Sequence, residues 1–534
     1  MNSKNNSTPN IKEAFDILRE YKRGKSKLES RIMSEREFWQ SRCAPSSNNS
    51  SAWLFNSIVS KHADILDNMP SCSCLPREEC DEKDASTLSQ IIPIIIDRCN
   101  FKEIYSDNSW LKLKYGAAIY GVFWNNALED GLGDIDIRPL RVEDVFWESG
   151  ARDVQDSKNL FVCGVWDKEA LDNTYPDAKI AEHKREIDGV ALEVYGAGFD
   201  SENKCVVVDW YYKKFDDYGV PRLHLCKFCG DVILYCSEND TECASGWYEH
   251  GQYPVIFDSL YPDEENIHGF GVIAVAKNSQ NSIDRLDNNI LEYADWSSKA
   301  RFWAKKSLGV NEKEFRDLSK SIIEVEGDID EEKLKQIEMA RLDDTILELR
   351  GLKIDELKET TGTRDFLQGG TTGGVVAATA IKRLQDSGEK FSRDGIEGSC
   401  RAYSKMITLV IELIRQFYDT PRYFRVKGEC GDSEYICYSG ILSEKNKRKS
   451  QGGELIRRPH FDIEITTAKR STNFAESANA LARELYDSGA FKPENARQTL
   501  IMLELMSFDG IGKVKKMLRD MCDAADSAQK SAND

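Results

Sequence analysis

This chain of 534 residues contains several groups of residues whose types and spacing could do chemistry. The first group is a glycine-rich loop at 361–374. Such a loop can cradle phosphates with its backbone N–H groups, but it then needs a lysine that reaches the outer phosphates. No lysine occurs in 361–374, two valines follow the last glycine, and the stretch comes after a predicted helix rather than a strand. These features disfavour nucleotide binding and predict a flexible loop between two helices.

Four cysteines, Cys226, Cys229, Cys236 and Cys243, form the next candidate site. A structural zinc site takes its ligands as close pairs presented by turns. Only Cys226 and Cys229 have that spacing, and in a strand their side chains would point to opposite faces. The pattern disfavours zinc, and the sequence alone leaves open whether these cysteines bind a metal.

Two aspartates at i and i+2, Asp134 and Asp136, could hold a metal ion, although such a pair more often forms a solvated strand surface. The six histidines are isolated, and the Gly-x-Ser-x-Gly pattern of a nucleophilic serine is absent. A metal-dependent hydrolase is therefore kept only as an alternative. A basic run, 445–458, could contact DNA or a protein partner, or could be a solvated loop.

Charge and cysteine content limit the classes of function. The net charge of −19 argues against a surface that binds nucleic acid by neutralising phosphates, although an acidic wall would let DNA slide past it. The 15 cysteines are odd in number and scattered, which favours free thiols in a reducing compartment such as a bacterial cytoplasm. The polar start of the chain lacks the apolar stretch of a signal peptide and is expected to be a disordered tail.

Apolar periodicity predicts a mainly helical N-terminal region, with helices at 11–40, 53–66 and 85–128. The stretch 70–84, rich in cysteine, proline and charge, is expected to be irregular. Alternation with period two then predicts a largely β module over 113–260. Its strands are expected at 134–139, 142–147, 160–166, 206–215, 222–228 and 231–235, with a hairpin at Gly230.

The rest of the chain is predicted to be mainly helical. A helix is expected at 273–296, with Ile283, Leu286, Ile290 and Tyr293 on one face. Further expectations are strands at 301–308 and 322–325, short helices at 312–318 and 331–340, longer helices at 344–361 and 375–418, β structure over 422–467 and three short helices within 473–523.

The order of these parts resembles that of the phage portal family. Members of that family typically have a Thr-Gly pair, followed by a second Ser-Gly or Thr-Gly segment that begins an Ala-rich helix. In this chain the first is Thr361-Gly-Thr363, and the second is Thr371-Thr-Gly-Gly-Val-Val-Ala-Ala378. Further similar segments stand in the same order at 131–137, 141–147, 248–255, 268–271 and 280–284. No single motif is specific, but together they cover nearly the whole chain.

The resemblance implies an α+β portal fold with a β-rich wing, a helical stem, a small mixed clip and a C-terminal helical crown. The implied boundaries are a disordered tail at 1–19, the wing at 20–268, the first stem helix at 269–297, the clip at 298–343, the second stem helix at 344–361, the tunnel loop at 362–374, a long wing helix and β segment at 375–472, the crown at 473–524 and a disordered tail at 525–534.

The resemblance also implies a function that needs no catalytic group and no cofactor. The protein would be one subunit of a dodecameric ring at a capsid vertex, forming the channel for genome packaging and ejection. Expected partners are the terminase large subunit, adaptor or head-completion proteins, the major capsid and scaffolding proteins, and double-stranded DNA. Assembly would take place in the host bacterial cytoplasm, the mature protein would reside in the virion, and no membrane would be involved. A different virion protein, such as an adaptor, is the second alternative.

The resemblance places the acting residues in two groups. In the tunnel loop facing DNA they are Gly362, Thr363, Arg364, Asp365, Gly369, Gly370, Thr371, Thr372, Gly373 and Gly374. In the clip that binds partners they are Arg301, Lys305, Lys306, Glu312, Glu314 and Arg316. The loop glycines would let the loop shift as DNA passes, because glycine tolerates many backbone conformations. Acidic stem positions, Asp284, Asp287, Glu292 and Asp295, could line a channel that repels the duplex.

Overall fold

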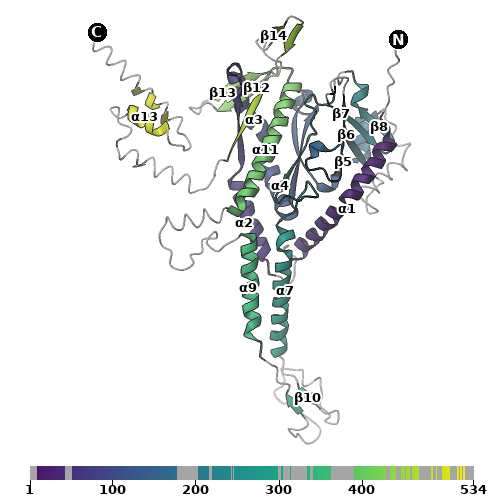
Figure 1. Cartoon of the computed structure of the whole chain (residues 1–534), viewed down its shortest axis with the longest axis vertical. Coiled ribbons are helices and arrows are strands. Elements are labelled where there is room, and N and C mark those ends of the chain that lie inside the picture. The colour runs from purple at the N-terminus through teal and green to yellow at the C-terminus, as the bar shows by residue number, and fades with distance from the viewer. Residues whose placement is uncertain are drawn as a thin grey trace. The chain divides into compact units, whose positions relative to one another are not determined.

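The computed structural model divides into two compact units, which are described separately (Figure 1). The first unit comprises residues 1–33, 60–271 and 389–534, and the second comprises 34–59 and 272–388. The described residues are 9–42, 51–176, 203–215, 219, 221–241, 243, 246–298, 302–304, 313, 334–336, 341–362, 390–427, 433–439, 447–450, 453–456, 460–467, 483–484, 487, 489, 496–504, 514–515, 517–519 and 521–522. Among them, no helix is both long and apolar enough to cross a bilayer.

A five-stranded antiparallel sheet, with its strands in chain order, forms the larger β part of the first unit. The strands are β4 (Val145–Trp147), β5 (Asn159–Asp167), β6 (Lys204–Phe215), β7 (Pro221–Cys229) and β8 (Val232–Cys236). Gly230, with a left-handed φ of 60°, turns β7 into β8, so the predicted hairpin is confirmed. The strands predicted from 160 to 235 are also confirmed. Of the strand predicted at 142–147 only β4 forms, after a 3-10 turn at Val142–Asp144.

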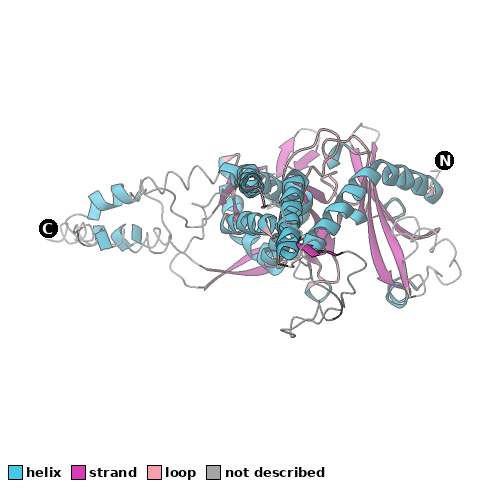
Figure 2. Ribbon diagram, turned by 90° about the horizontal axis from the view of Figure 1, so that it is seen from below, coloured by secondary structure: helices cyan, strands magenta, loops and turns pink. Residues whose placement is uncertain are grey.

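One face of this sheet is covered by the N-terminal part of α1 (Ile11–Arg42), which confirms the first predicted helix. Ala14, Leu18 and Tyr21 recur every three or four residues and therefore lie on one side of the helix. They pack against alternate strand residues such as Phe161 and Val208. Figure 2 shows this helix next to the magenta strands, close to the N-terminus.

Lys25 continues the buried stripe of α1 although it is charged. Its side chain is buried, and its ammonium donates a hydrogen bond to the carbonyl of Val145 at 3.0 Å and lies 3.1 Å from Glu29. Burial lowers the pKa of Lys25, and the neighbouring carboxylate of Glu29 opposes that shift. The contact with Val145 ties α1 to the first strand of the sheet.

A three-stranded antiparallel sheet of order β3-β2-β9 forms the second β part of this unit. Its strands are β3 (Asp134–Leu140), β2 (Ala117–Asn125) and β9 (Val255–Ser259). The helix predicted over 85–128 is wrong at β2, because the structure has α3 (Glu82–Arg98), α4 (Phe101–Tyr115) and then this strand. The first six residues of β2 are all buried, so the strand lacks the alternation that would have identified it.

A strand also replaces part of the segment predicted to be irregular at 70–84. The strand β1 (Pro70–Pro76) pairs antiparallel with β16 (Phe461–Thr467), and Cys72 and Cys74 face the core. The partner residues Ser71 and Thr466 are 395 positions apart. A pairing so distant along the chain leaves no signal in a short sequence window, because strand formation depends on tertiary context.

The remaining elements of the first unit largely follow the predictions. The helix α11 (Lys390–Phe417) confirms the predicted helix over its described part, and residues 375–389 lie outside the described residues. The hairpins of β12 (Arg422–Lys427) with β13 (Ser433–Tyr438) and of β14 (Lys447–Ser450) with β15 (Gly453–Ile456) confirm β structure after α11. In the C-terminal region, α13 (Ala496–Glu504) is a described helix.

The second unit is built on two helices, α7 (Val272–Ser297) and α9 (Asp344–Thr361), both predicted within one residue of their ends. The start of α2 (Trp53–Asp67) belongs to the same unit. Between the two long helices, β10 (Phe302–Ala304) pairs with β11 (Leu334–Gln336). The helix predicted at 331–340 is therefore wrong at β11, where pairing with a distant strand overrides the local preference.

A buried ion pair joins three elements of the first unit. The ammonium of Lys112 in α4 lies 2.6 Å from Asp258 in β9, and the two side chains are 0% and 2% exposed. Lys112 also donates hydrogen bonds to the carbonyl of Gly395 at 2.9 Å and to the hydroxyl of Ser399 at 2.8 Å, both in α11. Ser399 in turn donates to Asp258 at 2.9 Å. All three ammonium protons therefore have an acceptor, which a charge at this depth requires.

Removal of one partner of this pair is expected to destabilise the first unit strongly. We predict that Lys112→Met lowers the free energy of unfolding by about 3 kcal/mol or more, because Asp258 is left charged and buried. Urea unfolding followed by circular dichroism measures the change. The matched control is Lys102→Met, since Lys102 pairs with Asp97 at 3.0 Å on the surface and such pairs contribute less than about 1 kcal/mol. A loss no larger than that of the control would contradict the assigned role of Lys112.

Candidate functional site

The two long helices of the second unit hold each other through a short apolar contact and several polar ones. Ile283 of α7 is buried against Ile354 and Leu357 of α9, with Trp53 of α2 packed on the same cluster. Farther along, Arg350 of α9 pairs with Asp287 of α7, and Ser279 donates a hydrogen bond to Glu356 at 3.1 Å. The side chain of Asp343 caps the start of α9 by accepting from the N–H of Thr345 at 3.1 Å. The helix pair is thus fixed by its own residues.

A buried polar network extends this contact to the segment before α2. The amide of Gln280 donates to the carbonyl of Ser51 at 2.6 Å and to Asp284 at 2.8 Å, and its oxygen accepts from the N–H of Leu54 at 3.2 Å. Burial raises the pKa of the Asp284 carboxyl, and the bond from Gln280 and the charge of Arg42 oppose that shift. Gln280 and Asp284 are four positions apart and so share one helix face. The 280–284 segment, similar to portal sequences, is therefore a structural element of this unit.

Large apolar side chains remain exposed on both helices. The most exposed are Leu291 and Trp296 on α7, at 52% and 49%, and Leu352 on α9, at 66%. Leu347 and Leu349 are also exposed. A single exposed leucine is ordinary, but a set of large apolar residues on one pair of helices is typical of a surface that another protein covers.

Two of the four acidic positions of α7 are not free to face a channel. Asp284 is buried in the network with Gln280, and Asp287 pairs with Arg350 on α9. Glu292 and Asp295 are exposed. Asp284 and Asp287 therefore serve contacts inside the subunit, and only Glu292 and Asp295 remain as candidates to line a channel. The helical stripe through Ile283 is confirmed, since Ile283 is buried and the other predicted members are partly buried.

The predicted loop and clip residues are mostly outside the described part of the chain. Gly362 is described, and it ends α9 in a left-handed conformation with φ of 72°, which suits glycine. Residues 363–374, which hold the other loop predictions from Thr363 to Gly374, lie outside the described residues. So do the clip predictions Arg301, Lys305, Lys306, Glu312, Glu314 and Arg316.

The four candidate cysteines do not converge on one point. Cys226 and Cys236 are direct partners in the β7–β8 ladder and lie in the core beneath α1. Cys229 belongs to a separate cluster with Cys205 and with Leu171 of α5 (Lys168–Thr174). The prediction that Cys226 and Cys229 face opposite sides of the strand is confirmed. Within the described residues, no three His, Cys, Asp or Glu side chains are grouped as metal ligands would be.

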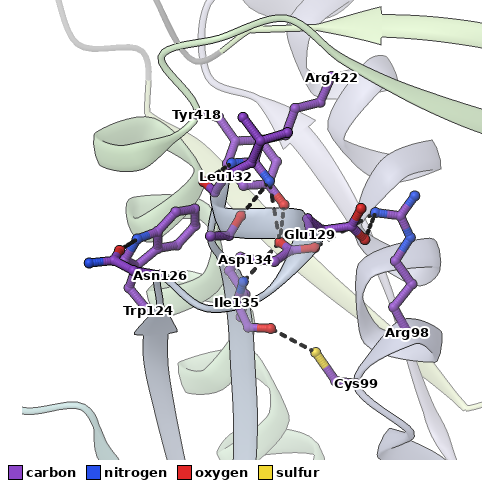
Figure 3. Close-up of polar contacts among 11 residues, drawn as sticks. Arg98, Cys99, Trp124, Asn126, Glu129, Leu132, Asp134, Ile135, Tyr418 and Arg422 are labelled. Carbon is purple, nitrogen blue, oxygen red and sulfur yellow. Dashed lines mark hydrogen bonds and ion pairs between the residues drawn. The ribbon is translucent and has the colours of Figure 1, made fainter. Parts of the chain in front are cut away.

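Asp134 is held by cations and a tyrosine, not exposed as part of a solvated acidic pair. Figure 3 shows its carboxylate beneath the 126–133 loop, with Arg98, Tyr418 and Arg422 directed toward it. The Tyr418 hydroxyl donates to Asp134 at 2.6 Å, and Arg98 and Arg422 lie 3.7 and 3.9 Å from its oxygens. The expectation of a solvated surface is wrong here, because α11 and β12 close over this strand end.

The same residues hold a strained loop in place. Glu129 and Asp130 have left-handed φ values of 50° and 56°, which cost roughly 1–2 kcal/mol each in a residue with a side chain. Arg422 donates to the carbonyls of Leu132 at 2.9 Å and Gly133 at 2.7 Å, and Arg98 contacts Glu129 at 3.3 Å. The cluster is therefore best explained as a structural support, a role that the spacing of Asp134 and Asp136 gave no reason to expect.

Loss of the charge of Asp134 is expected to weaken this support. We predict that Asp134→Asn lowers the free energy of unfolding by about 2 kcal/mol, because Arg422 loses its counterion in a buried setting. Urea unfolding measures the change, with Asp136→Asn as the control. Asp136 pairs with Arg138, whose side chain is 55% exposed, so the control should lose less than about 1 kcal/mol. If the two variants lost equal free energy of unfolding, the burial of Asp134 would not contribute to stability.

Comparison with protein families gives a match that covers most of the chain. The sequence model of the family described as phage P22-like portal protein matches residues 62–534, which include every described element from β1 onward. No curated protein sequence matches the chain. The matched range includes both α7 and α9 and the stretch between them. The chain therefore belongs to the phage P22-like portal protein family, and it is a structural, non-enzymatic protein of the capsid vertex through which phage DNA is packaged and ejected.

Proposed function

We propose that twelve copies of this chain form a closed ring in which α7 and α9 are the stem helices. Membership of the family implies an oligomeric ring with contacts to the capsid and the terminase. A ring closes when one face of each subunit matches the opposite face of its neighbour. The observation that carries the proposal is the set of exposed apolar residues on α7 and α9, two helices that flank the proposed clip. In the ring, Leu291, Leu347 and Leu352 would be covered by the neighbouring stem.

The other parts of the chain follow the same assignment. Residues 20–268 and 375–472 would form the wing, 298–343 the clip and 473–524 the crown, with tails at 1–19 and 525–534. The clip would bind the terminase large subunit during packaging and adaptor proteins afterwards, through Arg301, Lys305, Lys306, Glu312, Glu314 and Arg316. Capsid and scaffolding proteins would bind the ring as it assembles in the host cytoplasm.

The channel would be acidic in the stem and flexible at the tunnel loop. Glu292 and Asp295 are the exposed acidic positions of α7, and carboxylates that face DNA repel its phosphates and prevent tight binding. The tunnel loop would begin at Gly362, where α9 ends, and extend to residue 374. Arg364, the one cation in that loop, would contact phosphates briefly as the duplex slides past.

A charge in the apolar stem surface should prevent the ring from forming. We predict that Leu352→Asp shifts the purified protein from a ring of about twelve chains to single subunits, because a carboxylate would be buried without a partner at each interface. Light scattering and negative-stain electron microscopy measure this. Asn288→Asp, which adds an acid at another exposed stem position, is the control and should leave the ring intact. Intact rings of Leu352→Asp would place this surface outside the interface.

Stiffening the tunnel loop should impair packaging without affecting assembly. We predict that alanine at Gly369, Gly370, Gly373 and Gly374 leaves the mass of the ring unchanged but reduces the DNA packaged per head several-fold. Alanine disfavours the left-handed backbone conformations that glycine permits. The measurement is nuclease-protected DNA in a packaging reaction with the cognate terminase. Gly351→Ala in α9 is the control, since no atom lies within 4 Å of the added carbon. Normal packaging by the loop variant would exclude a moving loop.

A further inference from the structure

Two cysteines face each other across the β7–β8 ladder. Cys226 of β7 and Cys236 of β8 are direct partners in the register, and both side chains belong to the core beneath α1. They are 0% and 5% exposed. The strand β8 is at the edge of the five-stranded sheet, and Cys236 is its last residue (Figure 1). The pair therefore joins the edge of the sheet to the strand next to it.

The register places these two side chains where an antiparallel ladder brings them closest. The N–H of Leu225 points toward β8, since it donates a hydrogen bond to the hydroxyl of Ser237 at 3.0 Å. Successive N–H groups of a strand point to opposite sides, so the N–H of Cys226 points away from β8. Cys226 and Cys236 are thus a non-hydrogen-bonded pair, whose Cα atoms are typically about 4.5 Å apart. A disulfide needs Cα atoms about 4.4–6.8 Å apart, and the backbone of the ladder already meets that requirement.

The two sulfur atoms differ in acidity. The neighbouring thiol of Cys226 lowers the pKa of Cys236, and the backbone N–H groups of Glu238 and Asn239 act in the same direction, while burial opposes the shift. For Cys226, the neighbouring sulfur and burial both raise the pKa. Within the pair, Cys236 therefore loses its proton first, and its thiolate is the nucleophile.

We propose that Cys226 and Cys236 are a modification site, a pair of thiols that hydrogen peroxide converts into a disulfide between β7 and β8. The thiolate of Cys236 attacks one oxygen of the peroxide, the O–O bond breaks, hydroxide leaves, and Cys236 becomes a sulfenic acid. The sulfur of Cys226 then attacks that of Cys236, so that the S–S bond forms and the S–O bond breaks. The released hydroxyl leaves as water with the proton of Cys226. The two thiols lose two electrons in total, and the peroxide accepts them and ends as two molecules of water.

The position of Cys236 at the end of an edge strand gives the peroxide a route and the disulfide a consequence. Local opening at the end of β8 exposes Cys236 without unfolding the rest of the sheet. An edge strand also presents unpaired N–H and C=O groups with which other chains can pair. A covalent bond from the end of β8 to β7 keeps this strand in its own sheet. In a reducing compartment both residues stay thiols, and the bond forms when the protein meets peroxide without a reductant.

Mapping of the bridge in the full-length protein tests the proposal directly. The reduced, folded protein is treated with hydrogen peroxide, its remaining thiols are blocked with iodoacetamide in urea, and its tryptic peptides are identified by mass spectrometry. We expect two peptides joined through Cys226 and Cys236, with the loss of two hydrogen atoms, and their separation by dithiothreitol. Recovery of both cysteines in alkylated form would overturn the proposal. A bridge that forms only when peroxide is added in urea would also overturn it, because that bridge would belong to the unfolded chain.

Two single variants separate the roles of the two sulfurs. In Cys226→Ser the second sulfur is missing, so peroxide should leave Cys236 as a sulfenic acid that dimedone captures, whereas the wild type should give little of that adduct. Cys163→Ser is the matched control, because Cys163 is buried in the same core but lies opposite Val208 in the ladder. It should form the bridge at the rate of the wild type. Bonding of Cys236 to a cysteine other than Cys226 in the folded wild type would contradict the assigned pair.

Discussion

The first unit depends on the ion pair between Lys112 and Asp258, because it fixes α11 to the rest of that unit. Both side chains are buried, and Lys112 reaches two groups of α11 as well as the strand β9. Gly395 favours this close approach, because a Cβ there would lie 3.1 Å from the side chain of Leu260. An ammonium at this depth is stable only with every proton accepted. The position of α11 along the sheet is therefore set by polar geometry, and apolar packing alone would not define it as closely.

The second unit is stabilised differently, by few contacts of its own. Its apolar cluster consists of Ile283, Ile354 and Leu357 with Trp53, although α7 alone is about 39 Å long. Much of the helix surface stays exposed, including Leu352. Within the described residues the core shared by the two helices is small, and amphipathic helices gain most of their stability from packing. This property agrees with an oligomeric family. The buried Gln280–Asp284 network has a different task, because its bonds to Ser51 and Leu54 fix α7 to the start of α2.

The sequence predicted helices better than strands, for a physical reason. The helices α7 and α9 have apolar periodicity and clear ends, such as Asp343 and Gly362 at the two ends of α9, so local signals were sufficient. The strands β1, β2 and β11 were missed because their partners are distant or because both faces are buried, as in Ala117–Val122. The end of α9 at Gly362 was predicted, whereas the support around Asp134 was not foreseen. Its partners Arg98 and Tyr418 come from α3 and from the residue after α11, which no spacing along the chain could bring together.

A net charge of −19 is compatible with a role in handling DNA if acidic residues line the path along which DNA moves and basic residues lie elsewhere. A duplex that must slide cannot meet strong phosphate ligands along its path, because each neutralised phosphate adds to affinity and therefore to friction. Exposed carboxylates such as Glu292 and Asp295 suit that path. Tight contacts are useful only where DNA is held still, and there the net charge of the chain has little weight, because salt screens fields beyond about 10 Å.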